Sequence, residues 1–238
     1  MAVFLGLAAC AHESSGPAGA DEVSSTPTVV SLPDAQDIVP EVTAAVAGSG
    51  AARVSLTASE VSAGGDLIFG ADAAVVGLSL QVNDVQVLIA DGRHYLNLGQ
   101  ASGGMYLVVD PAGRFAQTFG PVVTLVDPVG FLSRLGAAVT SIEQRGLSEE
   151  IDGVSTTPYV FTVDVPQGFT PEQAALLGLA GGTVEVTVLV GPDLLPRRFS
   201  WSGDGGAVTM DYTDWGTKAG IESPPDDFVV DGAEFGYV

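Results

Sequence analysis

The sequence predicts an α+β fold with one large, bent antiparallel sheet and helices packed against its apolar face. Three observations indicate this. Apolar and polar residues alternate over many short runs. Glycine-rich and Asp-Gly turns separate these runs, as in antiparallel hairpins. Amphipathic helical segments interrupt the runs and carry too few polar residues to stand alone in water, so they must cover the apolar face.

Composition limits the possible partners of the chain. Its 238 residues include 8 basic and 29 acidic ones, which gives a net charge of −21. A surface this negative repels nucleic acid and anionic lipid headgroups, so we expect no nucleic-acid partner. Apolar residues make up 46% of the chain and charged ones 16%. This share of apolar residues is enough to form a large core, or a core that contains a cavity.

The pattern at the N-terminus predicts a lipoprotein signal peptide. Leu7-Ala8-Ala9-Cys10 ends an apolar stretch that is too short to span a bilayer, which takes about 20 residues. This pattern is typical of a lipobox, in which the cysteine thiol receives diacylglycerol and the chain is cleaved before it. Residues 1–9 are then a signal peptide, and its basic n-region should lie upstream of the recorded start. The alternative is that Cys10, the single cysteine, is a buried free thiol.

The next segment is expected to be a tether. Residues 10–33 comprise the acylated cysteine and a stretch of Gly, Pro, Ser, Thr and acidic residues without periodic apolar positions. Acyl chains would hold the protein on the outer face of the cell membrane. Residues 34–238 should form the folded domain, and a single cysteine excludes an intrachain disulfide.

The folded domain should begin with a helix over residues 34–47. Ile38, Val42 and Val46 fall at helical spacing, and Gly48–Gly50 should end the helix. Pro40 interrupts the pattern, so we expect the regular helix to begin there.

Strands follow from Arg53 onward. In Arg53–Glu60, Val54, Leu56 and Ala58 share one face, opposite polar residues. The other apolar faces comprise Val85, Val87 and Ile89; Leu96 and Leu98; Tyr159, Phe161, Val163 and Val165; Val184, Val186, Val188 and Val190; Phe199 and Trp201; and Val208, Met210 and Tyr212. The turns should lie at Gly64–Gly65, Asp91–Gly92, Asp152–Gly153, Gly181–Gly182 and Asp204–Gly206. Residues Asp226–Asp231 should form a closing edge strand guarded by its charges.

Two further helices should interrupt the strands. Asp127 is a candidate N-cap with Pro128 at the first helical position. Phe131, Leu132, Leu135 and Val139 then form one apolar stripe. The other helix should begin at the capping box of Thr170 and Gln173, continue through Leu176, Leu177 and Leu179, and end at Gly181–Gly182.

Several short motifs resemble those of a known family. His94–Leu98, Asp127–Leu132, Gly146–Val154 and Tyr159–Asp164 are similar, in order, to a short strand, a helix start, a hairpin and its continuation in the actinobacterial lipoproteins of the LppX/LprA/LprF/LprG type. Tyr212–Gly216, followed by Ile221–Pro224, resembles the C-terminal motif of that family. Gly103–Tyr106 departs from it, because members often carry a tryptophan after this turn. Residues 113–124 look like an unusually long loop.

The resemblance implies an unclosed half-barrel, as in the lipoprotein carriers LolA and LolB, with helices on the concave face. It also implies an apolar cavity that binds or transfers acylated lipids or glycolipids in the cell envelope. The residues that would line this cavity are Leu56, Val87, Ile89, Leu96, Leu98, Phe131, Leu132, Leu135, Phe161, Val163, Val186 and Val188. Apolar alternation of this kind is also typical of a filled core. The alternative is therefore a lipoprotein with a packed interior that binds a protein partner, such as an envelope transporter.

Catalytic and metal-binding functions are not expected. No G-x-S-x-G motif supplies a nucleophile for His94, and the other histidine, His12, lies in the tether. Spacings typical of metal ligands are missing, and no cofactor motif is present. Phe199, Trp201, Tyr212 and Trp215 are close in sequence. They could line the mouth of a cavity or pack a corner of the sheet.

Overall fold

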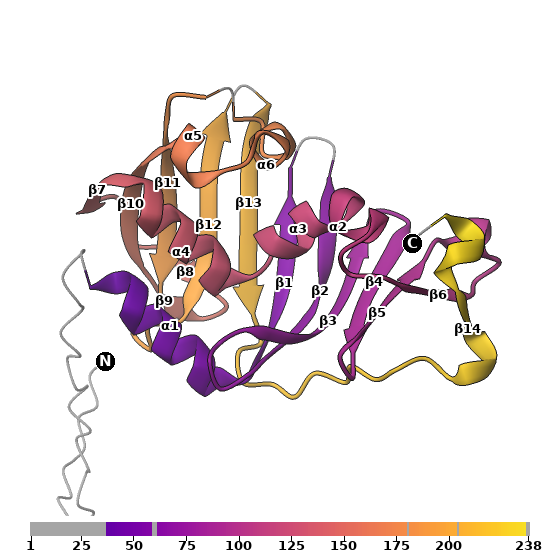
Figure 1. Ribbon diagram of the computed structural model, residues 1–238. Coiled ribbons are helices and arrows are strands. Elements are labelled where there is room, and N and C mark those ends of the chain that lie inside the picture. Colours follow the sequence, from indigo (N-terminus) through magenta and orange to yellow (C-terminus); the bar gives the residue numbers. More distant parts are fainter. Residues whose placement is uncertain (1–36, 59–60, 180, 204, 237–238) are drawn as a thin grey trace, which may run out of the picture. The chain divides into compact units, whose positions relative to one another are not determined.

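The alternating runs form one curved sheet in the computed structural model, which describes residues 37–58, 61–179, 181–203 and 205–236. Twelve strands of the described residues pair in the order β14-β6-β5-β4-β3-β2-β1-β13-β12-β11-β10-β7 (Figure 1). The strands are β1 (Ala51–Thr57), β2 (Ser62–Phe69), β3 (Val75–Val82), β4 (Val85–Ala90), β5 (Arg93–Asn97), β6 (Tyr106–Val109), β7 (Val139–Gln144), β10 (Thr157–Asp164), β11 (Thr183–Val190), β12 (Pro196–Gly203), β13 (Gly206–Thr213) and β14 (Val229–Asp231). Because β14 and β7 end the order without pairing with each other, the sheet is unclosed, as predicted.

The topology explains how the chain completes this sheet. Strands β1 to β6 follow one another toward one edge, and the chain then crosses the concave face as helices before it enters β7 at the other edge. Strands β10 to β13 return to the middle, where β13 pairs antiparallel with β1 and Val54 lies opposite Tyr212. The segment after β13 then runs back to place β14 parallel to β6. This parallel pair is an exception to the predicted antiparallel pattern.

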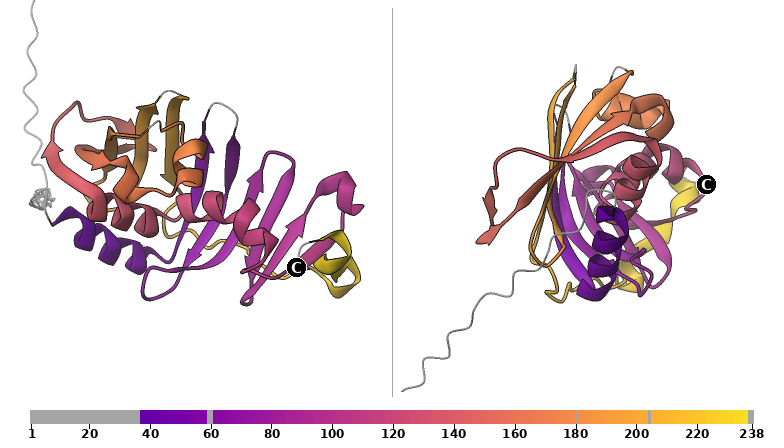
Figure 2. Two further views of the ribbon diagram at one scale, coloured as in Figure 1. Left: turned by 45° about the horizontal axis from the view of Figure 1, so that its top comes forward. Right: turned by 90° about the vertical axis from the view of Figure 1, so that its left-hand side faces the viewer.

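Six α-helices lie among the described residues, namely α1 (Ile38–Ser49), α2 (Arg114–Thr118), α3 (Gly120–Leu125), α4 (Pro128–Ala138), α5 (Val165–Gly168) and α6 (Pro171–Leu176). Figure 2 shows α1 to α6 on the concave side of the sheet, as expected. Single 3-10 turns form η1 (Gly99–Ser102), η2 (Asp226–Phe228) and η3 (Gly232–Phe235), and β8 (Glu150–Ile151) and β9 (Val154–Ser155) make a separate hairpin.

The predicted starts of α4 and α6 are confirmed, but α1 begins at Ile38, ahead of Pro40, because proline is tolerated in the first turn of a helix. The predicted helix ends are partly wrong. Asp127 caps α4 by accepting a hydrogen bond from the backbone N–H of Val129 at 3.1 Å. Both hydrogen bonds of the predicted capping box of α6 are present. However, Val139 is extended and begins β7 instead of continuing α4. Helix α6 ends at Leu176. Gly178 follows shortly after it with a φ of 64°, a left-handed conformation in which a right-handed helix cannot continue.

Two further expectations about the chain path are corrected. The segment expected to be a loop, residues 113–124, contains α2 and most of α3. Gly64–Gly65 lies inside β2 rather than in a turn. A Cβ atom at Gly65 would lie 1.9 Å from the carbonyl oxygen of Ser79, so glycine is needed there for β2 and β3 to approach each other. Asp91–Gly92 and Asp152–Gly153 do form hairpin turns, with positive φ at both residues.

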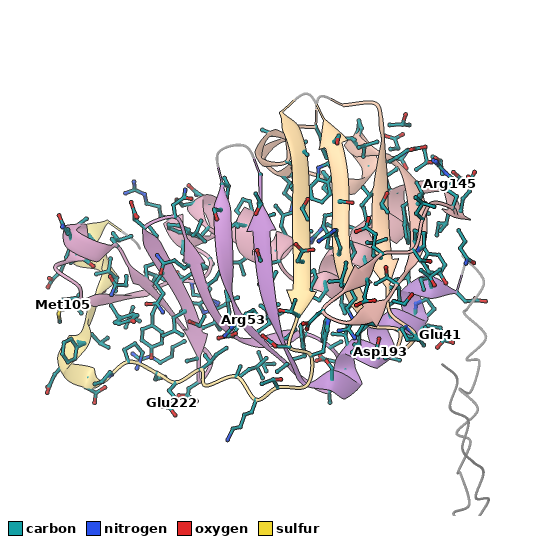
Figure 3. The ribbon with its side chains drawn as sticks, turned by 180° about the vertical axis from the view of Figure 1, so that it is seen from behind. Glu41, Arg53, Met105, Arg145, Asp193 and Glu222 are labelled. Carbon is teal, nitrogen blue, oxygen red and sulfur yellow. The ribbon has the colours of Figure 1, made fainter. Side chains whose placement is uncertain are left out.

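The two faces of the sheet differ as predicted. Concave side chains and the helices form one apolar core. Figure 3 shows the opposite, convex face, where Arg53 lies near the middle and pairs with Asp66 at 3.0 Å. One small apolar cluster of Leu88, Ala90 and Tyr95 also lies outside this core, where Ile221 of the returning C-terminal segment packs against it. This cover explains why β4 and β5 are apolar on both faces.

Candidate functional site

The residues proposed to line a lipid cavity all come together in the interior. Ten of them are at most 2% exposed. The other two, Ile89 and Leu98, are half-buried and pack against the same cluster. Side chains this deeply buried border no space that a water molecule could enter, so protein atoms fill the interior around these ten residues. Contact of these residues with a lipid stays a prediction.

Helix α4 supplies the centre of this interior. Its capping carboxylate at Asp127 fits because residue 130 is glycine: a Cβ atom there would lie 2.4 Å from Oδ2 of Asp127. The first turn then directs Phe131 and Leu132 into the sheet, and Leu135 follows one turn later. All three side chains are fully buried.

An aromatic cluster surrounds Phe131, and we define it as Phe131, Phe169, Phe199, Trp201 and Tyr212. The ring centroid of Phe131 lies 5.3 Å from that of Phe199, 5.6 Å from that of Trp201 and 6.0 Å from that of Phe169. Phe199 in turn meets Tyr212 edge-on at 5.7 Å. These are favourable geometries for aromatic pairs. Of the two interpretations left open for Phe199, Trp201 and Tyr212, the structure therefore favours packing.

Polar groups beneath the cluster hold α3 and α4 in place. The hydroxyl of Tyr212 donates to the carbonyl oxygen of Val126 at 3.1 Å, and burial raises the pKa of Tyr212 well above its usual value. The guanidinium of Arg134 donates to the carbonyl oxygen of Thr124 at 2.5 Å. Burial raises the pKa of Asp127 and lowers that of Arg134, and each charge partly offsets this effect on the other.

An open apolar groove of about 400 Å³ lies beside α5 and α6. Its lining includes Val165, Pro166, Phe169, Pro171, Ala174 and Leu179. None of the described residues that line this groove carries a charge, although the chain has 29 acidic residues. Phe169 belongs both to the groove and to the aromatic cluster, so the groove is separated from the interior by this ring.

A hydrogen bond joins the residue that follows α6 to the aromatic cluster. Nε1 of Trp201 donates to the carbonyl oxygen of Leu177 at 3.3 Å, which is long for such a bond. On its other side, α6 borders a second groove of about 480 Å³ against α2 and α3, with Gln117, Thr124 and Gln173 among its lining residues. Helix α6 therefore lies between two open grooves.

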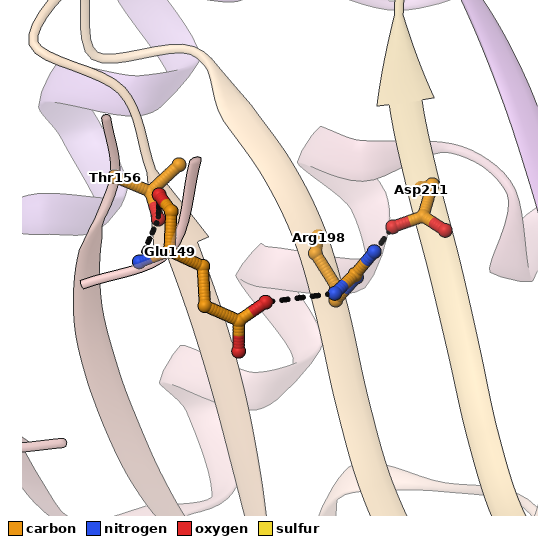
Figure 4. Close-up of polar contacts among 4 residues, drawn as sticks. All are labelled: Glu149, Thr156, Arg198 and Asp211. Carbon is orange, nitrogen blue, oxygen red and sulfur yellow. Dashed lines mark hydrogen bonds and ion pairs between the residues drawn. The ribbon is translucent and has the colours of Figure 1, made fainter. Parts of the chain in front are cut away.

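A hydrogen-bonded network on the convex face joins separate parts of the chain (Figure 4). Arg198 of β12 pairs with Asp211 of β13 at 2.5 Å and with Glu149 at 2.9 Å. The hydroxyl of Thr156 donates to the carbonyl oxygen of Glu149 at 2.8 Å. This network fixes the segment between β7 and β8 against the sheet.

The other sequence candidates gain no chemical role from the structure. His94 lies 5.4 Å from the ring of Phe115, and burial lowers its pKa. Within the described part of the chain, no group of three or more His, Cys, Asp or Glu side chains could hold a metal ion. Cys10 and the tether lie outside the described residues. No helix in the described ranges is long and apolar enough to cross a membrane.

Comparisons with known proteins agree with this architecture. Neither a protein-family model nor a curated protein matches the sequence. The solved structure of LprF from Mycobacterium bovis is similar, with a TM-score of 0.53, 20% identity, and coverage of 81% of this chain and 98% of that one. The lipoprotein LppX from Mycobacterium tuberculosis gives a TM-score of 0.52, 18% identity, and coverage of 79% and 97%. The chain therefore has the fold of these proteins, as the sequence resemblance implied.

Proposed function

We propose that this chain is a membrane-anchored, non-enzymatic lipoprotein that binds or transfers acylated lipids or glycolipids in the cell envelope. In this proposal residues 1–9 are a signal peptide, Cys10 carries the acyl anchor, residues 10–33 are the tether, and residues 34–238 bind lipid. The observation that carries the proposal is the uncharged groove beside α5 and α6, which meets the aromatic cluster at Phe169.

The energetics of an acyl chain support this use of the groove. Burial of one methylene contributes about 0.8 kcal/mol, so a chain of about 16 carbons could gain on the order of 10 kcal/mol before ordering costs. The groove volume of about 400 Å³ lies within the usual range for small-molecule sites. An acyl chain needs few polar contacts, in keeping with the apolar lining.

Entry into the interior requires movement. Because side chains fill the space around Leu96, Phe161 and Val188, an acyl chain can enter the interior only if α6 and Phe169 shift outward. Lipid would then select a more open conformation, at a free-energy cost that its own burial must exceed. The long Trp201–Leu177 hydrogen bond is one of the contacts that such a shift would break.

Binding of a fluorescent fatty acid to the purified full chain tests the proposal. We expect Ala175→Glu, which places a carboxylate in the groove, to weaken binding at least tenfold, because a bound acyl chain would cover this charge and leave it without a partner. Ala207→Glu is the matched control. Ala207 is also exposed, but it lies on β13, in a different hollow whose lining includes the polar residues Glu185 and Thr187. Equal binding by both variants, or no bound lipid when the protein is isolated from its own envelope, would refute lipid binding at this groove.

A second function is favoured by the filled interior. A core that stays closed would make this chain a lipoprotein that binds a protein partner through its surface. In that case the wild-type chain takes up no fatty acid, and its mass spectrum shows no associated lipid.

A further inference from the structure

The two edges of the sheet differ in how they are protected. Strand β14 spans three residues and is flanked by the 3-10 turns η2 and η3. Strand β7 spans the six residues Val139–Gln144 and contains neither proline nor lysine, two common protectors of edges. On its outer side no other strand of the described sheet pairs with it. An edge of this kind offers backbone donors and acceptors to an added strand.

The two faces of β7 differ in chemistry. Val139 and Ile142 are half-buried and pack against the main core, and Ile142 lies opposite Phe161 of β10. Glu143 points to the other face, and its side chain is 61% exposed. A strand added beside β7 would therefore gain from apolar residues on the concave side and from basic residues on the convex side.

The charge around this edge favours a basic partner. Glu143, Glu150 and Glu185 are exposed here, and Arg145 is already paired with Glu143 and Glu185 (Figure 3 labels Arg145). A second copy of this chain would bring a further charge of −21 to the same edge. Repulsion between the two negatively charged copies would oppose their association. Lysine or arginine side chains of another protein would instead be attracted to the exposed glutamates at this edge.

The loop that follows β7 is fixed to the sheet and carries an exposed apolar side chain. Glu149 is fixed by Thr156 and Arg198, as Figure 4 shows, and this anchors the loop that leaves β7. Leu147 in that loop is 87% exposed. A partner strand that continued past Gln144 would cover this apolar side chain.

We infer that β7 binds an extended segment of another protein by strand addition, and that apolar and basic residues alternate in this segment. Main-chain hydrogen bonds along the free edge would provide part of the affinity. Ile142 and Glu143 would set which side chains are accepted on each face. This interaction does not depend on whether the groove at α5 and α6 binds lipid.

Hydrogen exchange of the full chain tests the inference. The probe is a synthetic capped peptide of alternating valine and lysine, and the control peptide has glutamate in place of lysine. We expect the lysine peptide to slow exchange in residues 139–144, and the glutamate peptide to have no effect. Glu143→Lys should weaken binding of the lysine peptide about five- to tenfold, because an attraction becomes a repulsion. The matched variant Glu222→Lys, on the C-terminal segment, should bind like the wild type.

The exchange pattern distinguishes strand addition from loose charge attraction. Protection confined to β7, and lost in Glu143→Lys, supports the inference. Peptide binding without protection of β7, or equal weakening by both lysine variants, would overturn it. Protection of β7 that grows with protein concentration in the absence of peptide would also overturn it, and would assign the edge to a second copy of this chain.

Discussion

Replacement of Phe131 by alanine tests the central packing of the molecule. The side chain is fully buried and its ring contacts Phe169, Phe199 and Trp201. Truncation of a buried phenylalanine to alanine costs about 3–5 kcal/mol, and aromatic pairs add to the packing of the ring. We therefore expect Phe131→Ala to lower the free energy of unfolding by about 4 kcal/mol.

Urea unfolding measures this loss. The midpoint should fall at an unchanged slope, and for a domain of this size the melting temperature should drop by roughly 8–16 °C. Far-UV circular dichroism is the safer probe, because the fluorescence of Trp201 will itself respond to the loss of its neighbour. A loss below about 1 kcal/mol would refute the packing described for α4.

The same variant also probes the path of an acyl chain. Removal of the Phe131 ring opens space next to Phe169, so a fatty acid that enters from the groove should restore part of the lost stability. Phe69→Ala is the control, because Phe69 is equally apolar and buried but stacks on Trp215 at 5.8 Å, outside the groove lining. Equal rescue of both variants by fatty acid would exclude the groove as the route of entry.

Two further substitutions test the sheet and the cap of α4. Gly65→Ala should prevent folding or lower stability by more than about 3 kcal/mol, since its Cβ would overlap the carbonyl of Ser79; a wild-type urea midpoint would contradict this close approach. Asp127→Asn keeps a good N-cap but removes a carboxyl group whose pKa burial raises. The stability contributed by the protonated form of Asp127 is lost as pH rises through its raised folded pKa, so the variant should gain stability relative to the wild type as pH rises above the usual pKa of an aspartate. A constant difference over this range, measured by urea unfolding, would contradict the raised pKa.

Local chemistry made much of the fold readable from the sequence. Alternation in Val54–Ala58 and in Val184–Val190 identified strands and their apolar faces, because strand side chains point alternately to the two sides. Asp127 and Thr170 identified two helix starts, because an N-cap depends only on residues within one turn. The short helices between Arg114 and Leu125 were missed, because no side-chain cap marks either start.

Long-range contacts decided the remainder. The pairing of β1 with β13, the parallel position of β14 and the close approach at Gly65 depend on segments far apart in sequence. Alternation shows which side chains avoid water but not which atoms they contact. The sequence pattern around Leu96 and Phe161 would therefore be the same whether the interior were hollow or filled. By itself, the sequence determined a one-sided sheet covered by helices. Only the tertiary structure decided that side chains fill its interior around these residues, that the uncharged groove lies beside α5 and α6, and that β7 is left as the open edge, because each follows from how distant segments pack.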